Sequence, residues 1–206
     1  METLRTFVAI ELGSALQAAL RRAQDGLSAQ IPARSVRWVR PEGIHLTLKF
    51  LGDTPAEQVD AVKAALARAA AEVESFHLTA AGLGCFPNAR QPRVVWIGLE
   101  EPSGALAQLQ RAVEAQIAPL GFPTERRAFS PHLTLARVQP YASRSDVRLI
   151  GEAVAASMVA TLAEMQAMAV SYIKSDLRPS GAVYTTLFEA RLGRLSSLPL
   201  EGEGAR

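Results

Sequence analysis

The sequence predicts an α+β fold organised as two pseudo-symmetric halves. The main evidence is a near repeat, HLTLKF at residues 45–50 and HLTLAR at residues 132–137. Strand-like segments also come in neighbouring pairs, which favours antiparallel sheets, and the helix-like segments between them can cover one face of a sheet. No shorter repeat runs along the chain, so a solenoid is excluded.

The first half of the chain begins with a strand and an amphipathic helix. Residues 5–12 are rich in β-branched and aromatic side chains, as strands are. The helix that follows has Ser14 as its expected N-cap, and it carries one apolar face. Residues 28–44 predict a polar connection punctuated by prolines.

The first copy of the repeat predicts a strand that leads into a second helix. The strand covers residues 45–52, and the helix covers residues 54–73. Thr54 is the expected N-cap, Pro55 the first helical residue and Glu57 the partner of Thr54 in a capping box.

The second half predicts strands, helices and loops in a similar alternation. Apolar alternation marks the strands, 3.6-residue periodicity marks the helices, and Pro and Gly mark the loops. The expected elements are strands at 76–84, 94–100, 132–137, 161–173 and 182–192, helices at 103–118 and 143–157, and loops at 86–92, 121–131 and 175–181. We expect one domain over residues 1–195 and a loosely held tail over residues 196–206.

Composition places the chain among ordinary globular proteins. The 206 residues are 49% hydrophobic and 20% charged, with a formal net charge of +2. The single cysteine, Cys85, excludes an internal disulfide framework and a multi-cysteine zinc site. No apolar run approaches the ~20 residues of a membrane span, and the N-terminus lacks a signal-peptide pattern, so we expect a cytoplasmic protein and no membrane partner. Arginines, which suit phosphate, gather at 34, 37, 40, 90, 93, 126 and 127.

The repeated segments predict an acid–base site. Residues i and i+2 of a strand share a face, so His45 lies beside Thr47, and His132 lies beside Thr134. Two such strands side by side would present two imidazoles and two hydroxyls to one cleft. That set suits displacement at phosphorus: one histidine takes the proton of the attacking oxygen, the other protonates the leaving oxygen, and the hydroxyls hold the phosphate.

The fifth residue after each histidine is Phe50 in the first copy and Arg137 in the second. A regular strand would turn both to the opposite face from the histidines. They can reach the site only if the strand ends or forms a bulge before them.

Other interpretations of the histidines and of the cysteine fit the sequence less well. His77 begins a third His-Leu-Thr, but the next residues do not match the repeat, so we expect an incidental strand histidine. Zinc is the competing hypothesis for paired histidines, yet the spacing supplies no further ligands, and we expect no metal. Cys85 is expected to be a buried apolar residue and not a nucleophile.

At these motifs the sequence resembles the two-histidine phosphoesterase superfamily, and within it the RNA 2′,3′-cyclic phosphodiesterases, historically called 2′-5′ RNA ligases. The resemblance covers most of residues 4–190. It is carried by the segments RTFVAIEL, RWVRPEGIHLTLKFLGD, GLGCFPNARQPRVVWIGL, FSPHLTLAR and SYIKSDLRPSGAVYTTL.

The resemblance implies a fold of two lobes, each an antiparallel sheet backed by helices, around a central groove. It implies hydrolysis of RNA 2′,3′-cyclic phosphate ends to a 2′-phosphomonoester and a free 3′-hydroxyl, with neither metal nor cofactor. His45 would be the general acid and His132 the general base. Thr47, Thr134 and Arg137 would bind the phosphate, and Phe50 matches a family aromatic in the substrate site.

Three alternatives stay open at this point. The chain could hydrolyse small cyclic nucleotides or ADP-ribose cyclic phosphate, or it could be a non-catalytic RNA-binding module. A ligase activity that joins 2′-phosphate-type ends would be the reverse chemistry at the same site. The expected partner is an RNA or oligonucleotide end with a cyclic phosphate, and the expected state is a monomer.

Overall fold

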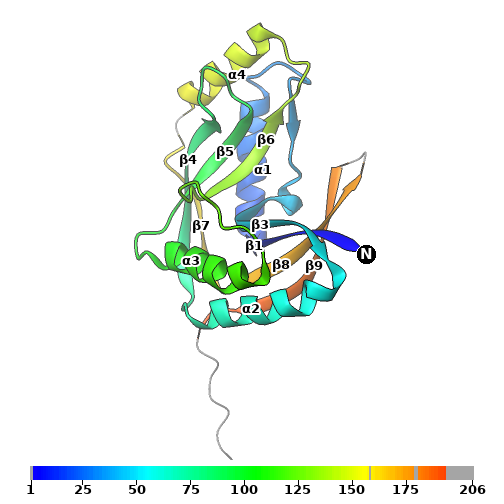
Figure 1. Cartoon of the computed structure of the whole chain (residues 1–206). Coiled ribbons are helices and arrows are strands. Elements are labelled where there is room, and N and C mark those ends of the chain that lie inside the picture. Colours follow the sequence, from blue (N-terminus) through cyan, green and yellow to red (C-terminus); the bar gives the residue numbers. More distant parts are fainter. Residues whose placement is uncertain (1, 158, 179–180, 194–206) are drawn as a thin grey trace, which may run out of the picture.

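Two antiparallel sheets form the frame of the computed structural model, which describes residues 2–157, 159–178 and 181–193. The four-stranded sheet has the order β3-β1-β8-β9. Its strands are β1 (Thr3–Glu11), β3 (His45–Pro55), β8 (Ala169–Arg178) and β9 (Gly181–Arg191). Helices α2 (Val59–Ala71) and α3 (Ala105–Ile117) pack on one side of it (Figure 1).

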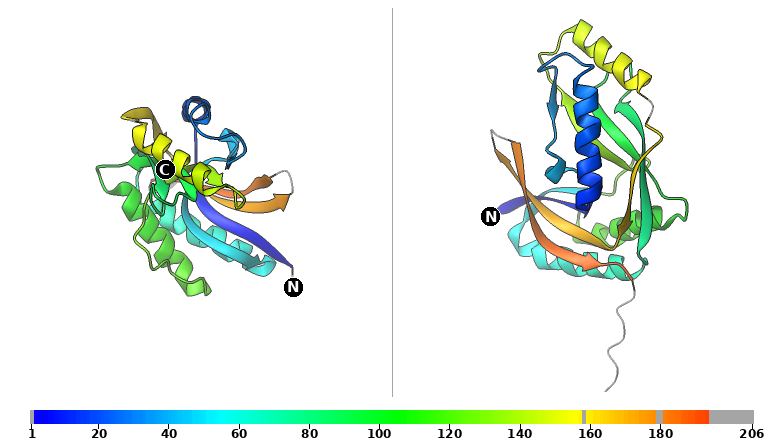
Figure 2. Two further views of the ribbon diagram at one scale, coloured as in Figure 1. Left: turned by 90° about the horizontal axis from the view of Figure 1, so that it is seen from above. Right: turned by 180° about the vertical axis from the view of Figure 1, so that it is seen from behind.

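The five-stranded sheet has the order β2-β6-β5-β4-β7. Its strands are β2 (Val36–Trp38), β4 (Phe76–Phe86), β5 (Val94–Glu100), β6 (His132–Val138) and β7 (Thr161–Ala167). Helices α1 (Ser14–Ser28) and α4 (Arg144–Ala156) lie behind it, as the rear view in Figure 2 shows. Short 3₁₀ turns are η1 (Pro41–Gly43), η2 (Ala56–Gln58) and η3 (Ala118–Leu120).

The main hydrophobic core joins the two lobes. Apolar residues of both sheets and of α1, α2 and α3 form one buried cluster. A second cluster lies between α1, α4 and the five-stranded sheet. The α+β class and the two-lobed arrangement predicted from the sequence are therefore confirmed. Helices α2 and α3 cover one face of the four-stranded sheet, and α1 and α4 cover one face of the five-stranded sheet. We call the opposite face of each sheet its open face.

The predicted capping box at residue 54 is wrong. Strand β3 continues to Pro55, which pairs with Thr3, and α2 begins only at Val59. Thr54 is fully buried, and its hydroxyl lies 2.7 Å from that of Thr6 across the strand pair. A buried hydroxyl needs a hydrogen-bond partner, and here the neighbouring strand supplies it in place of the helix.

The predicted strand over residues 161–173 is in fact two strands in different sheets. Ala167 pairs with Phe76 in the five-stranded sheet, whereas Ala169 pairs with Arg191 in the four-stranded sheet. Met168 forms the corner between them. Apolar alternation continues through this corner, so the pattern gave no sign that the chain changes sheets.

Smaller differences concern chain ends and connections. Helix α1 begins at Ser14, and the N-cap position belongs to Gly13, which is also tolerated there. The connection predicted over residues 28–44 contains β2 and η1. Strand β8 runs on to Arg178, so residues 175–178 of the expected turn are strand. The expected tail at 196–206 lies outside the described residues. Within the described ranges, no helix has the length and apolar content needed to cross a membrane.

Candidate active site

The first motif occupies the start of β3 and turns its polar side chains to the open face. Leu46 and Leu48 are 1% and 4% exposed and belong to the main core. His45 and Thr47 alternate with them and are partly exposed. The local structure follows from strand periodicity, because the apolar residues are drawn to the core and carry the polar ones to the other side.

The second motif repeats this arrangement on β6. Leu133 and Leu135 are fully buried in the same core cluster, and His132 and Thr134 alternate with them. The two motif strands belong to different sheets, yet β3 and β6 contact each other. The structure therefore brings together two segments whose histidines are 87 residues apart in the sequence (132 − 45).

A β-bulge in each motif strand carries the later residue of the motif to the open face. Ala9 pairs with Thr47 and Val8 with Lys49, so Leu48 is the extra residue in β3. The alternation then shifts by one position, and Phe50 lies on the histidine side, 70% exposed.

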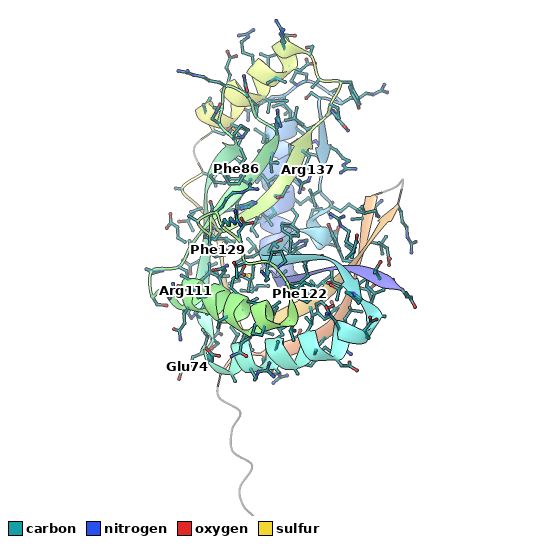
Figure 3. All side chains as sticks on the ribbon, viewed as in Figure 1. Glu74, Phe86, Arg111, Phe122, Phe129 and Arg137 are labelled. Carbon is teal, nitrogen blue, oxygen red and sulfur yellow. The ribbon has the colours of Figure 1, made fainter. Side chains whose placement is uncertain are left out.

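The bulge in β6 lies at the equivalent position. Trp96 pairs with Thr134 and Val95 with Ala136, so Leu135 is the extra residue. Leu135 and Ala136 are both buried, and Arg137 is exposed on the side of His132. Figure 3 labels Arg137 beside the motif strand β6. Phe50 and Arg137 could reach the face of the histidines only if the strand ended or formed a bulge before them, and both strands have such a bulge.

Each imidazole is held by a backbone carbonyl two residues before it. Nδ1 of His45 lies 2.9 Å from the Gly43 oxygen, and Nδ1 of His132 lies 2.7 Å from the Ser130 oxygen. A carbonyl oxygen only accepts, so Nδ1 carries the proton in both rings. Nε2 is then a lone-pair acceptor in the neutral ring and a donor in the protonated ring, which is what proton transfer requires.

Aromatic rings enclose His45. Phe7 stacks on it with ring centroids 4.5 Å apart, and Tyr184 meets it edge-on at 5.1 Å. Burial lowers the pKa of His45 below its ordinary value, although the Gly43 carbonyl and the charge of Glu11 act in the opposite direction. In the free protein this environment favours the neutral imidazole.

His132 has a different aromatic neighbour. The ring of Phe86 meets it edge-on at 4.9 Å and lies 5.2 Å from the ring of Trp96. The indole lies against Gly84, where a Cβ would collide with it. Its buried Nε1 has no hydrogen-bond partner among the described residues. The two histidines therefore share a backbone frame but not an environment.

Sequence reasoning missed these aromatic neighbours. Phe7 and Tyr184 come from strands at opposite ends of the chain, and Phe86 ends β4. Strand alternation could have placed each ring on a face of its own strand. It could not show that Phe7 and Tyr184 meet at His45, because that depends on β1 lying between β3 and β8 in the sheet.

Lys49 is a buried charge behind the first motif. Its side chain is 2% exposed, and Nζ lies 2.6 Å from Oε2 of Glu114 on α3 and 2.7 Å from the Pro123 carbonyl. It ties β3 to α3 and to the segment that leads into the second motif. The bulge at Leu48 turns Lys49 to this side, so the regular pattern could not have placed it there.

The remaining candidates lie away from the motif strands or are buried. His77 is exposed on β4 and pairs with Gln166 of β7. Cys85 is buried, and burial raises the pKa of its thiol, as suits an apolar core residue. In the part of the chain that the structure describes, no three His, Cys, Asp or Glu side chains are grouped so that they could hold a metal ion.

The fold and the paired motif strands match known phosphoesterases. A family model described as LigT like Phosphoesterase matches the chain twice, over residues 10–96 and 97–184. Each motif histidine lies 35 residues after the first matched residue of its half (45 − 10 and 132 − 97). The repeat seen in the sequence is therefore a duplicated unit.

Full-length relatives support the same grouping. A protein of Methanothermobacter thermautotrophicus named RNA 2′,3′-cyclic phosphodiesterase is 34% identical over 190 residues, which are 92% of this chain and 99% of the relative. One of the same name from Thermus thermophilus is 32% identical over 210 residues, 98% of each chain.

Solved structures have the same fold. A protein from Thermus thermophilus superposes with a TM-score of 0.78 at 30% identity, over 93% of this chain and 99% of the other. Escherichia coli LigT, solved with 3′-AMP, gives 0.72 at 25% identity, over 93% and 99%. The fold and the motifs thus define a two-lobed phosphoesterase. The chain belongs to the LigT-like phosphoesterase family.

Proposed function

We propose that this protein hydrolyses RNA 2′,3′-cyclic phosphate ends to a 2′-phosphomonoester and a free 3′-hydroxyl. The proposal rests mainly on two strands that contact each other. Each presents, on the open face of its sheet, a threonine and a histidine whose Nδ1 is hydrogen-bonded to a backbone carbonyl. The name shared by relatives such as those from Methanothermobacter thermautotrophicus and Aquifex aeolicus supports the RNA substrate.

The reaction is a displacement at phosphorus by water. Nε2 of neutral His132 accepts a proton from the water, whose oxygen forms the new bond to phosphorus. The bond from phosphorus to the 3′-oxygen breaks, and that oxygen takes the proton from Nε2 of protonated His45. The phosphate remains on the 2′-oxygen. His132 then loses its proton to solvent and His45 regains one.

The neighbouring side chains stabilise the phosphate. Thr47 and Thr134 are partly exposed beside the two histidines, and their hydroxyls donate to the non-bridging oxygens. Arg137 supplies positive charge from the second motif strand, and Phe50 supplies an exposed ring for a base on the first.

Substrate binding favours the protonated form that His45 needs as the general acid. Burial lowers the pKa of His45 in the free protein, which favours the neutral form. A bound phosphate adds negative charge beside the ring and raises that pKa again, so the proton is held when the leaving oxygen is in place. The mechanism involves no metal ion and no cofactor.

The decisive experiment uses purified protein treated with EDTA and an oligonucleotide with a 2′,3′-cyclic phosphate, its products resolved by end type. We expect full hydrolysis to the 2′-phosphate in excess chelator. Activity that disappears with EDTA and returns with zinc or manganese would overturn the two-histidine mechanism. Turnover of 2′,3′-cyclic mononucleotides but not of the oligonucleotide would favour the small-molecule alternative, and binding without turnover would favour the non-catalytic one.

A further inference from the structure

Arg37 lies directly opposite Arg137 in the five-stranded sheet. The two residues pair across β2 and β6, so their side chains share the open face. Val36, before Arg37, and Ala136, before Arg137, are both buried on the helix side. The alternation confirms that both arginines point away from the core, and both are exposed.

This pairing is unfavourable in the absence of an anion. Like charges directly opposite each other on a sheet destabilise it. Among the described residues, no carboxylate lies within 4.0 Å of either guanidinium. Two like charges placed opposite each other next to a candidate site indicate a binding function, because a bound anion would remove their repulsion.

The arginine pair lies in line with the second motif. On the open face of β6, His132 pairs with Gly98, Thr134 with Trp96, and Arg137 with Val94. Arg37 extends the last of these rows onto β2. Arg137 lies three residues along β6 from Thr134, about 10 Å, and Arg37 lies opposite it on β2, the edge strand of the sheet.

We propose that Arg37 binds a second phosphate of the substrate, the one on the 5′ side of the terminal nucleotide, next to Arg137, which supplies positive charge to the cyclic phosphate. The inference rests on the proposed function, because it takes the cyclic phosphate to lie at the histidines. A cyclic end has no nucleotide beyond its 3′ side, so the next phosphate of an RNA lies 5′ of it. The preferred substrate is then an oligonucleotide with at least two phosphates.

The test compares two substrates in the wild type and in Arg37→Gln. One is a nucleoside 2′,3′-cyclic phosphate with a 5′-hydroxyl, and the other is a dinucleotide that ends in the same cyclic phosphate. The ratio of their kcat/KM values, dinucleotide over mononucleotide, should fall at least about tenfold in Arg37→Gln, since a hydrogen bond to a charged group is lost. The salt dependence for the dinucleotide should weaken by about 0.7 in the logarithmic slope.

Arg22→Gln is the matched control. Arg22 is exposed on α1, behind the sheet, so the variant removes the same charge away from the open face. The ratio should stay at its wild-type value there. A ratio that does not change in Arg37→Gln, or that falls equally in both variants, would overturn the second subsite.

Measurements of product binding test the second phosphate subsite independently of the proposed function. If the wild type turned over neither substrate, the proposed function would be wrong. Calorimetric titration with a dinucleotide 2′-phosphate and a mononucleoside 2′-phosphate would still test the subsite. Tighter binding of the dinucleotide that is lost in Arg37→Gln supports it, and equal affinities in the wild type contradict it.

Discussion

His45 and His132 illustrate how one backbone frame gives two chemical environments. Both rings donate Nδ1–H to a carbonyl two residues back and sit one residue before a buried leucine. His45 is enclosed by Phe7 and Tyr184, whereas His132 meets only Phe86 among the described aromatic rings. Proteins separate the roles of two like groups through such differences in environment.

The first prediction concerns the three histidines of the chain. His45→Ala and His132→Ala should each lower kcat by ~10²–10⁴, the usual contribution of a general acid or base. His77→Ala should stay within a few-fold of the wild type, because His77 is exposed on β4 beside Gln166. Circular dichroism checks that all three variants are folded. A loss in folded His77→Ala as large as in the other two would mean that the wrong pair was chosen.

The second prediction concerns the pKa of His45 in the free protein, measured by NMR titration of its imidazole protons. Phe7→Ala uncovers His45 and should raise its pKa toward the ordinary ~6.5, because burial is the largest cause of the lowering. The His45 signals should therefore titrate at higher pH in this variant than in the wild type.

Glu11→Gln should shift the pKa of His45 in the opposite direction. Glu11 pairs with His45 across β1 and β3, and its charge raises the pKa of the imidazole. Removing the charge should lower that pKa further, so the His45 signals should titrate at lower pH than in the wild type. An unchanged or reversed shift in either variant would contradict the effects of burial and of the Glu11 charge.

At the level of the elements, the two bulges decide which residues reach the site. One buried side chain supports the bulge in β6: Nε2 of Gln24 on α1 donates to the carbonyls of Leu135, at 3.0 Å, and of Val39, at 2.7 Å. Gln24 is 7% exposed. It therefore joins the bulge of the second motif strand to the segment that leads into the first.

The third prediction is that Gln24→Leu weakens both the fold and the site. It removes a donor from the buried Leu135 carbonyl and from the part-buried Val39 carbonyl, which should cost about 1–3 kcal/mol in urea unfolding, and kcat should fall as Thr134 and Arg137 shift. Gln17→Leu is the control on the same helix, because the Gln17 side chain donates to the nearby Leu12 carbonyl and, within the described part of the chain, to no other residue. Equal losses of kcat in the two variants would show that Gln24 has no special part in holding the bulge.

At the scale of the whole molecule, one core belongs to both lobes. Leu46 and Leu48 of β3 lie in the same buried cluster as Leu133 and Leu135 of β6. The strands that carry the two histidines are thus fixed to each other from behind. The buried Lys49–Glu114 ion pair adds a polar link on the same side.

The fourth prediction is a single cooperative unfolding transition. Trp38 and Trp96 both lie in the five-stranded sheet, so their fluorescence reports one lobe, whereas far-ultraviolet circular dichroism reports the whole chain. The two urea curves should coincide, because the shared core lets neither lobe unfold alone. Two separated midpoints would show that the lobes are independent.

The sequence by itself determined the class of fold, the duplicated motif and the faces of the motif strands. These are local properties: alternation decides that Leu46 is buried and His45 is not, and the repeat marks the same frame in His132. The same local reasoning failed at Thr54, whose hydroxyl found a partner in Thr6 across the sheet, and at Met168, where the chain changes sheets.

The tertiary structure decided what depends on distant pairing. It placed β1 between β3 and β8 and so brought Phe7 and Tyr184 to His45. It put bulges at Leu48 and Leu135, which turned Phe50 and Arg137 to the site, and it set Arg37 opposite Arg137. Register and bulges are set by the partner strand and the packing behind it, and a single strand's sequence does not contain that information.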